Sequence, residues 1–206
     1  MKKAILIHGY HSKEVINDPA KPTPSNHQWL PWVSKQLYLN EIFPIAIEMP
    51  EPWNPNYKSW KRELERFDID DGTVLVGHSY GGGFLVHWLS ETTKKVGKVI
   101  LVAPYMGLPS ESVRSSQTPE ETAEFFDFQI DRDIVKKTKN GIAIFVSKDD
   151  NPNILESVKL VNENADNIKT VWFDNKGHFR IKQMGTDHFP ELINEILYGK
   201  IKEAKC

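Results

Sequence analysis

The sequence predicts an α/β fold, in which a mostly parallel sheet of about six strands carries helices on both faces. Short apolar runs recur along the chain, and most of them are continuous rather than alternating, as in Val99–Val102 and Ile142–Val146. Continuous apolar runs are typical of strands buried on both faces. Segments with helical spacing separate these runs, and such alternation favours parallel strands joined by crossover helices.

Each expected strand is a short apolar run bounded by turn residues. In chain order the strands are Lys3–His8, Ile45–Met49, Thr73–Gly77, Val99–Ala103, Gly141–Ser147 and Thr170–Phe173. Between or after them, apolar residues recur with the spacing of one helix face. These helices are Pro31–Leu39, Asn56–Phe67, Gly82–Thr93, Ile154–Glu163 and Phe189–Tyr198.

The chain length favours one domain over residues 1–206, because domains commonly hold roughly 100–200 residues. No repeat, low-complexity tract or linker divides the sequence. A chain of this size buries about 70% of the surface that it exposes when unfolded, which suffices for an unaided core. The single cysteine, Cys206, leaves no intramolecular disulfide and no cysteine-based zinc site.

Charge and hydropathy exclude several classes of protein. The 26 basic and 28 acidic residues give a net charge of −2, without the basic footprint of a nucleic-acid-binding protein. The first apolar run stops at His8-Gly9, which is too short for a signal peptide, and no later run approaches the ~20 apolar residues of a membrane span. We therefore expect a cytoplasmic protein with neither a nucleic-acid nor a membrane partner.

Two connections are longer than the expected elements require, residues 9–30 and residues 104–130. Loops beyond ~12–15 residues are usually functional or disordered. The second contains an acidic and aromatic helix candidate, Pro119–Phe128. This segment follows the carboxyl end of a strand, where open α/β sheets bind ligands. It therefore forms either a lid over a pocket or a surface helix whose aromatic residues pack on the core.

The segment Gly77-His78-Ser79-Tyr80-Gly81 runs from an expected strand directly into an expected helix. Its G-x-S-x-G spacing is that of a nucleophile elbow, a sharp turn that strains the serine backbone and exposes the hydroxyl. Small residues on both sides are needed because strand and helix approach closely there. The glycine spacing fits neither a phosphate loop nor a dinucleotide fingerprint. We therefore predict Ser79 as a nucleophile.

A nucleophilic serine needs a base and an orienting acid, which follow it in this fold in the order Ser, Asp or Glu, His. Asp149-Asp150 and His178 each come directly after an expected strand. They therefore lie at the same sheet edge as Ser79. His178 would take the Ser79 proton, and one aspartate would hold the imidazole tautomer and stabilise the imidazolium.

Of the two adjacent aspartates, Asp150 is the predicted acid. Asp side chains readily accept the backbone N–H two residues on. For Asp149 that donor is Asn151, whereas for Asp150 the residue is Pro152, which has no N–H. Asp150 is thus freer to accept a hydrogen bond from His178, and Asp149 is suited to bracing the turn.

The oxyanion of an acyl-transfer intermediate needs two backbone donors. We predict the N–H of Tyr80, one residue past the nucleophile, and the N–H of Tyr10, in the loop after the first strand. Gly9 lets that loop approach. Gly9, Trp29 and Tyr105 are the predicted substrate-binding residues.

The remaining histidines have structural interpretations. His8, His11 and His27 lack metal-ligand spacing, so we expect no metal and no cofactor. His78 is expected to pack behind the elbow. His188 is interpreted as a helix-entry residue, although it is the one rival to His178 near the end of the chain.

Six segments carry a family resemblance: Ile5-Leu6-Ile7-His8-Gly9, Trp29-Leu30-Pro31-Trp32, Glu48-Met49-Pro50-Glu51-Pro52, Val76-Gly77-His78-Ser79-Tyr80-Gly81-Gly82, Ser147-Lys148-Asp149-Asp150 and Gly177-His178-Phe179. Over nearly the whole chain, the sequence resembles the small serine hydrolases related to retinoblastoma-binding protein nine, in the α/β-hydrolase superfamily. The resemblance implies a three-layer α/β-hydrolase fold without a large cap domain, and a catalytic set of Ser79, Asp150 and His178. Two departures, a longer loop after Gly9 and Val146 where the family often has glycine, bear on pocket shape and substrate.

The sequence thus predicts a serine hydrolase that cleaves a small ester, or less readily an amide, through an acyl-enzyme. We expect a monomer or weak dimer with a small-molecule substrate. One alternative is an interaction module that keeps the fold without turnover. Another is a different chemistry on the same fold. Ser79 disfavours a haloalkane dehalogenase, which needs aspartate at the elbow, and the segment 104–130 is small for a lipase lid.

Overall fold

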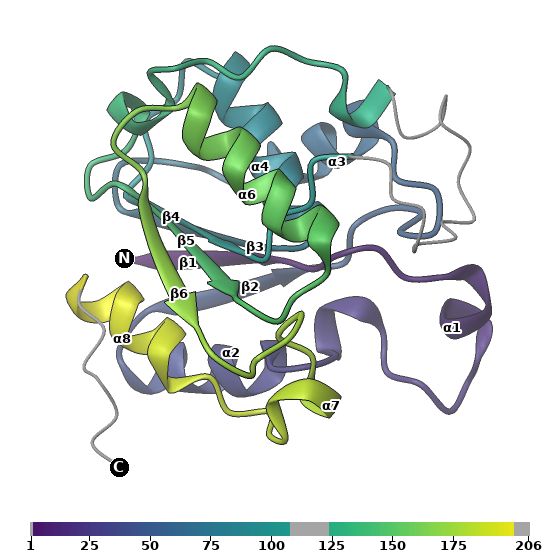
Figure 1. Cartoon of the computed structure of the whole chain (residues 1–206). Coiled ribbons are helices and arrows are strands. Elements are labelled where there is room, and N and C mark those ends of the chain that lie inside the picture. The colour runs from purple at the N-terminus through teal and green to yellow at the C-terminus, as the bar shows by residue number, and fades with distance from the viewer. Residues whose placement is uncertain (1, 108–123, 200–206) are drawn as a thin grey trace.

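The computed structural model describes residues 2–107 and 124–199, which form a central sheet flanked by helices (Figure 1). The sheet has six strands, all parallel, in the order β2-β1-β3-β4-β5-β6. They are β1 (Lys3–Ile7), β2 (Phe43–Ile47), β3 (Thr73–His78), β4 (Lys98–Val102), β5 (Ile142–Ser147) and β6 (Lys169–Phe173). All six predicted strands are confirmed.

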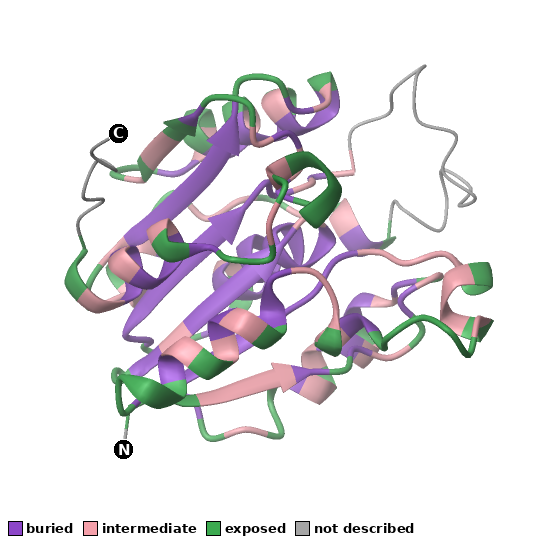
Figure 2. Cartoon of the chain, turned by 90° about the horizontal axis from the view of Figure 1, so that it is seen from below, coloured by how far each residue is buried: buried purple, intermediate pink, exposed green. Residues whose placement is uncertain are grey.

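Strand β2 differs most from its prediction. It lies two residues earlier in the chain than the predicted Ile45–Met49, and its register with β1 pairs Phe43 with Lys3 and Ile47 with Ile7. Phe43 is exposed at the sheet edge, so its burial pattern does not mark the start of the strand. Figure 2 shows the difference between this partly exposed edge strand and the buried central strands.

The helices lie on both faces of the sheet (Figure 1). On one face are α3 (Tyr57–Leu64), α4 (Tyr80–Glu91) and α6 (Pro152–Asn164), and on the other are α2 (Leu30–Leu39) and α8 (Pro190–Tyr198). The five predicted helices are thereby confirmed, and the three layers are those of the predicted fold class. The sequence did not predict the short helices α1 (Lys13–Asn17), α7 (Ile181–Met184), η1 (Pro24–Asn26) and η2 (Ile134–Lys137). Helices this short carry too few residues for a periodic apolar signal.

The loops expected to be functional are described in part. The connection after β1 holds α1 and η1. Of the helix candidate Pro119–Phe128, residues 119–123 lie outside the described residues, as does most of the segment 104–130, and residues 124–126 are helical. Among the described residues, no helix has the length and apolar character needed to cross a membrane.

The strand order places a topological switch between β1 and β3. From β1 the chain first adds β2 on one side and then continues through β3, β4, β5 and β6 on the other. In open α/β sheets, ligands bind outside the carboxyl ends of the strands at such a switch. Residues that directly follow β1 and β3 therefore meet at the position favoured for a site.

Candidate active site

Ser79 lies in a strained turn between β3 and α4. Its backbone has φ 55° and ψ −116°, in the positive-φ region that non-glycine residues rarely adopt. The flanking glycines make this turn possible: a Cβ on Gly77 would lie 2.3 Å from the Gly81 carbonyl oxygen, and one on Gly81 would lie 2.6 Å from the His8 carbonyl oxygen. The expected elbow geometry and its requirement for small residues are both present.

The third consecutive glycine of the elbow serves the segment that follows β4. A Cβ on Gly83 would lie 2.0 Å from the Tyr105 carbonyl oxygen. The Tyr105 N–H donates to the Ser79 carbonyl at 3.1 Å. The glycine run therefore lets Tyr105 pack beside the nucleophile, next to the start of α4.

The structure brings Ser79, His178 and Asp150 together. His178 Nε2 lies 3.0 Å from Ser79 Oγ, and His178 Nδ1 lies 3.1 Å from both Asp150 carboxylate oxygens. A carboxylate only accepts, so Nδ1 carries the proton and Nε2 can accept from the serine hydroxyl. The Asp150 side chain is 1% exposed, whereas Ser79 and His178 are half-buried. This arrangement can move a proton from Ser79 to His178 while Asp150 stabilises the imidazolium.

Asp149 braces a different contact from the one expected. It accepts a hydrogen bond from Ser147 Oγ and another, at 3.1 Å, from the Gly177 N–H. The Asn151 N–H instead donates to Asp150 Oδ1 at 2.7 Å, so the turn predicted at Asp149 is wrong. The Ser147 hydroxyl, followed by backbone donors that include the Gly177 N–H, lowers the pKa of Asp149. Asp149 therefore ties the loop after β5 to the loop that carries His178.

His78 packs behind the elbow, as expected. It is buried, and its Nε2 lies 3.0 Å from the His178 carbonyl oxygen, so Nε2 must donate. Burial, followed by the proximity of His178, lowers the pKa of His78 well below its ordinary value. A neutral His78 thus supports the backbone of the residue that contacts Ser79.

The prediction that Trp29 contacts substrate is wrong. Its side chain is fully buried, and its indole Nε1 donates to the Phe179 carbonyl at 3.1 Å. Its ring contacts His78 and Phe189, with centroid distances of 5.7 and 5.5 Å. Trp29 therefore belongs to the core layer under the site, where it holds the loop after His178.

Gly9, Tyr10 and Tyr105 lie around the nucleophile. A Cβ on Gly9 would lie 2.9 Å from Ser79 Cβ and 3.5 Å from its Oγ. The Tyr80 ring contacts those of Tyr10 and Tyr105, at centroid distances of 5.7 and 4.9 Å. Burial raises the pKa of both Tyr80 and Tyr105. The Tyr80 and Tyr105 phenols are therefore neutral, and the three rings pack together around Tyr80, the residue after Ser79.

Sequence reasoning missed a histidine cluster next to Gly9. Ring centroids are 5.5 Å apart for His8 and His11 and 5.8 Å apart for His11 and His27. The three histidines lie in and just before one long loop, but their spacing fits no metal-ligand pattern and so indicates no common site. Within the described ranges, no group of three or more His, Cys, Asp or Glu residues is arranged to hold a metal.

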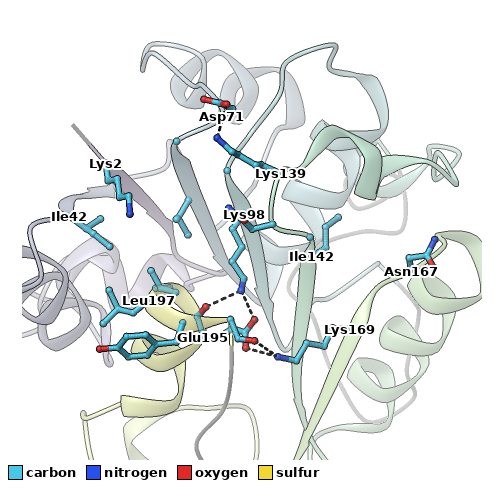
Figure 3. A pocket seen from close by; sticks show the side chains of 18 residues that line it. Lys2, Ile42, Asp71, Lys98, Lys139, Ile142, Asn167, Lys169, Glu195 and Leu197 are labelled. Atoms are coloured by element: carbon cyan, nitrogen blue, oxygen red, sulfur yellow. Dashed lines mark hydrogen bonds and ion pairs between the residues drawn. The ribbon is translucent and has the colours of Figure 1, made fainter.

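A hollow of about 710 Å³ lies at the opposite, amino edge of the sheet (Figure 3). It is lined by the starts of the strands and the end of α8, with Lys98, Lys169 and Glu195 among its residues. Ser79, Asp150 and His178 do not line it. The volume of a cavity therefore does not locate the candidate site in this molecule.

Solved structures share this fold. The product of the ydeN gene of Bacillus subtilis has a TM-score of 0.75 at 23% identity, over 97% of this chain and 98% of that one. Est1E from Butyrivibrio proteoclasticus has a TM-score of 0.63 at 15% identity, over 95% and 84% of the two chains. Together with the strained serine elbow, these matches define the class as the α/β-hydrolase fold.

Sequence comparison gives the family. The serine hydrolase family model matches residues 6–196, so the chain belongs to the serine hydrolase family. The putative hydrolase YdeN of Bacillus subtilis is 26% identical over 153 residues, which is 72% of this chain and 71% of that protein. The resemblance inferred from the motifs is confirmed at the level of a small serine hydrolase, and the protein is a hydrolase enzyme.

Proposed function

We propose that this serine hydrolase cleaves a small ester, or less readily an amide, with Ser79 as nucleophile, His178 as base and Asp150 as orienting acid. One observation carries the proposal: His178 lies within hydrogen-bond distance of both a strained, half-buried serine and a buried carboxylate. Nucleophile, base and orienter in mutual contact are the diagnostic arrangement for acyl transfer.

The reaction follows from these contacts. Ser79 Oγ attacks the acyl carbon as its proton passes to His178 Nε2. Collapse of the tetrahedral intermediate breaks the bond to the leaving group, which takes the proton from His178 and departs. A water molecule then attacks the acyl-enzyme as its proton passes to the same nitrogen. The bond between the acyl carbon and Ser79 Oγ breaks, His178 returns the proton to Ser79 Oγ, and the acid departs. No cofactor enters these steps.

The N–H groups of Tyr80 and Tyr10 are the proposed oxyanion donors. Tyr80 directly follows Ser79 at the start of α4, where backbone N–H groups favour negative charge. The closeness of Gly9 to Ser79 supports a role for the next residue, Tyr10. Gly9 and Tyr105 are the proposed substrate neighbours.

The names of structurally similar proteins support an ester as the class of substrate, but they do not identify a particular ester. Est1E is described with ferulic acid bound, and another structure with this fold is an esterase from Exiguobacterium antarcticum. A bromoperoxidase from Bacillus anthracis shares the fold as well, so the proposal depends on the site rather than on the fold. A single domain over residues 1–206 and a cytoplasmic location remain parts of the proposal.

Labelling with a fluorophosphonate, beside a panel of short-chain aryl esters, tests the proposal. The wild-type protein should be labelled and should hydrolyse at least one ester. Ser79→Ala should lose both properties with a melting temperature unchanged or raised, because the strained serine is a place where stability and activity oppose each other. A wild-type protein that is neither labelled nor active would instead favour the silent interaction module.

A further inference from the structure

Two imidazoles contact the carbonyl oxygen of Gly9, the residue beside the nucleophile. His8 Nδ1 lies 2.7 Å from this oxygen and His11 Nδ1 lies 3.1 Å from it. A carbonyl oxygen only accepts, so both Nδ1 atoms carry a proton and donate. Gly9 O therefore receives two side-chain hydrogen bonds in a loop that has no regular partner strand.

The tautomer of His8 is determined from its second nitrogen as well. Its Nε2 accepts from the Met49 N–H at 3.0 Å, so the ring is neutral with its proton on Nδ1. Glu48 lies 3.6 Å from the same nitrogen. Burial is the main reason that the pKa of His8 falls to about 4. At neutral pH, His8 is thus a donor to Gly9 with one available orientation.

His11 has a supporting series of its own. Its Nε2 lies 3.5 Å from His27 Nδ1, and His27 Nε2 lies 3.5 Å from Gln28 Nε2. With Nδ1 of His11 protonated, every contact has one consistent direction, from Gln28 through His27 and His11 to Gly9. Burial lowers the pKa of both His11 and His27, which favours these neutral rings.

The series also reaches the loop that carries the base. Gln28 Oε1 accepts from the Ile181 N–H at 2.8 Å, three residues beyond His178. The contact with the Ile181 N–H therefore fixes the orientation of the Gln28 amide, with its oxygen toward Ile181 and its nitrogen toward His27. The side of the site that holds Gly9 and the side that holds His178 are joined through three side chains, those of His11, His27 and Gln28, and the Ile181 N–H.

The consequence concerns Tyr10. The peptide bond between Gly9 and Tyr10 is planar and trans, so the Gly9 C=O and the Tyr10 N–H point in opposite directions. Holding the carbonyl with two donors thereby determines the direction of the N–H. Hydrogen bonds to a carbonyl also polarise its amide and strengthen the N–H as a donor.

We propose that His8 and His11, the latter supported by His27 and Gln28, are positioning residues that orient and polarise the Gly9–Tyr10 peptide for oxyanion stabilisation. The inference rests on the proposed function, because it assigns the Tyr10 N–H to the oxyanion. None of the four side chains exchanges a proton with substrate. They act through the peptide, which costs no reorganisation during the reaction because the donors are already in place.

A pair of substitutions at His11 tests the proposal. His11→Asn keeps a side-chain N–H donor near the position of Nδ1, and His11→Leu removes it. We expect His11→Leu to lose roughly tenfold in kcat with little change in KM, less than the ~10²–10³ lost when an oxyanion donor is removed outright. The affinity for phenylboronic acid, whose serine adduct is tetrahedral, should fall by the same factor. His11→Asn should keep most of the wild-type kcat and most of the affinity for phenylboronic acid. The control is His188→Leu, because His188 is exposed and lies outside the series.

A second measurement does not depend on turnover. In protein labelled with ¹⁵N-tyrosine, the Tyr10 amide is identified by its loss in Tyr10→Phe. We expect its proton resonance to move upfield in His11→Leu and to stay near the wild-type position in His11→Asn. An unchanged Tyr10 resonance would overturn the inference. Equal losses of kcat in the two His11 variants, with equal falls in melting temperature, would also overturn it. Absent labelling of the wild-type protein by fluorophosphonate would instead mark the failure of the proposed function.

Discussion

A carboxylate is buried at the amino ends of the strands and another at their carboxyl ends, and the two have different partners. At the amino edge, Glu195 is 1% exposed and accepts from Lys98 at 2.5 Å and from Lys169 at 2.7 Å (Figure 3). At the carboxyl edge, the equally buried Asp150 meets one nitrogen of His178, whose other nitrogen meets Ser79.

The two sites differ in what else the partner of the buried carboxylate can do. Lys98 gives a second hydrogen bond to the Glu195 carbonyl at 2.9 Å, and Lys169 gives one to the Gly199 carbonyl at 3.2 Å. Both ammonium groups are thus committed to holding α8 on the sheet. His178 can change protonation state and stands between an acid and a hydroxyl. A buried carboxylate indicates chemistry only when its partner can pass a proton on.

The largest expected effect separates the two histidines near the end of the chain. We expect His178→Ala to lower kcat by at least about 10⁴, because the proton acceptor for Ser79 is removed. His188→Ala should change kcat less than twofold, since His188 is exposed and stacks on Trp32. Both variants are compared at saturating substrate, and equal losses would reverse the assignment of the base.

The next effect distinguishes the adjacent aspartates. Asp150→Asn should cost about 10⁴ in kcat, through the wrong imidazole tautomer and the lost stabilisation of the imidazolium. Asp149→Asn should mainly cost stability, at about 1 kcal/mol, because it weakens the contacts to Ser147 and Gly177. Measuring kcat and melting temperature for both variants checks this. A larger kcat loss in Asp149→Asn at unchanged melting temperature would contradict it.

Substitutions at the amino ends of the strands should lower the free energy of unfolding without changing kcat. Lys98→Met removes a buried partner, and breaking a buried pair costs about 3 kcal/mol or more. The Lys169 side chain is 46% exposed, so Lys169→Met should cost less than about 1 kcal/mol. Urea unfolding measures both losses. We expect kcat to be unchanged in either variant, and a selective kcat loss in Lys98→Met would contradict a purely structural amino edge.

The last expected effect is a pH dependence of stability in the unsubstituted protein. The pKa of His8 is about 4 in the folded protein and 6.5 ordinarily. Above pH 6.5 His8 is neutral in both the folded and the unfolded chain, so its burial then costs no stability through protonation. Between pH 6.5 and about 4, the unfolded chain binds a proton that the folded protein does not, and stability falls by up to roughly 3 kcal/mol. His11 and Glu48 face His8, and the lowered pKa of His11 acts in the same direction.

Urea unfolding between pH 7 and 4.5 measures this slope. His8→Gln removes the titrating group, so its stability should depend less on pH, whereas His188→Gln should keep the wild-type slope. A wild-type protein that is equally stable at both ends of the range would contradict the burial of a neutral His8.

Much of the fold was predictable because a strand that is buried on both faces has a continuous run of apolar residues in the sequence. Ile142–Val146 and Val99–Val102 needed no tertiary information to be recognised. The elbow was predictable for a similar reason, since Gly77 and Gly81 flank Ser79 wherever strand and helix approach this closely. The edge strand β2 was placed less well, because Pro44 interrupts the apolar residues at its start and only Ile47 of the strand is buried.

Side-chain directions were less predictable. Trp29 was predicted to contact substrate, but its packing against His78 and Phe189 buries it completely. Asp149 was assigned a local backbone donor, and a donor 28 residues away took that place. In both cases the competing partner comes from a distant part of the chain, which local spacing cannot reveal.

The sequence by itself determined the order of strands and helices, the strained serine turn, and the appearance of an acid and a histidine after later strands. Those features depend on neighbours within a few residues, where steric limits and apolar periodicity act. The choice of Asp150 as the partner of His178 was predicted, although the Asp149 turn that supported it is absent. Only the tertiary structure decided that Asp149 pairs with Gly177 rather than Asn151, and that Gln28 contacts the loop that carries His178. These contacts join segments that are far apart along the chain, so they exist only once the parallel sheet has aligned the carboxyl ends of its strands.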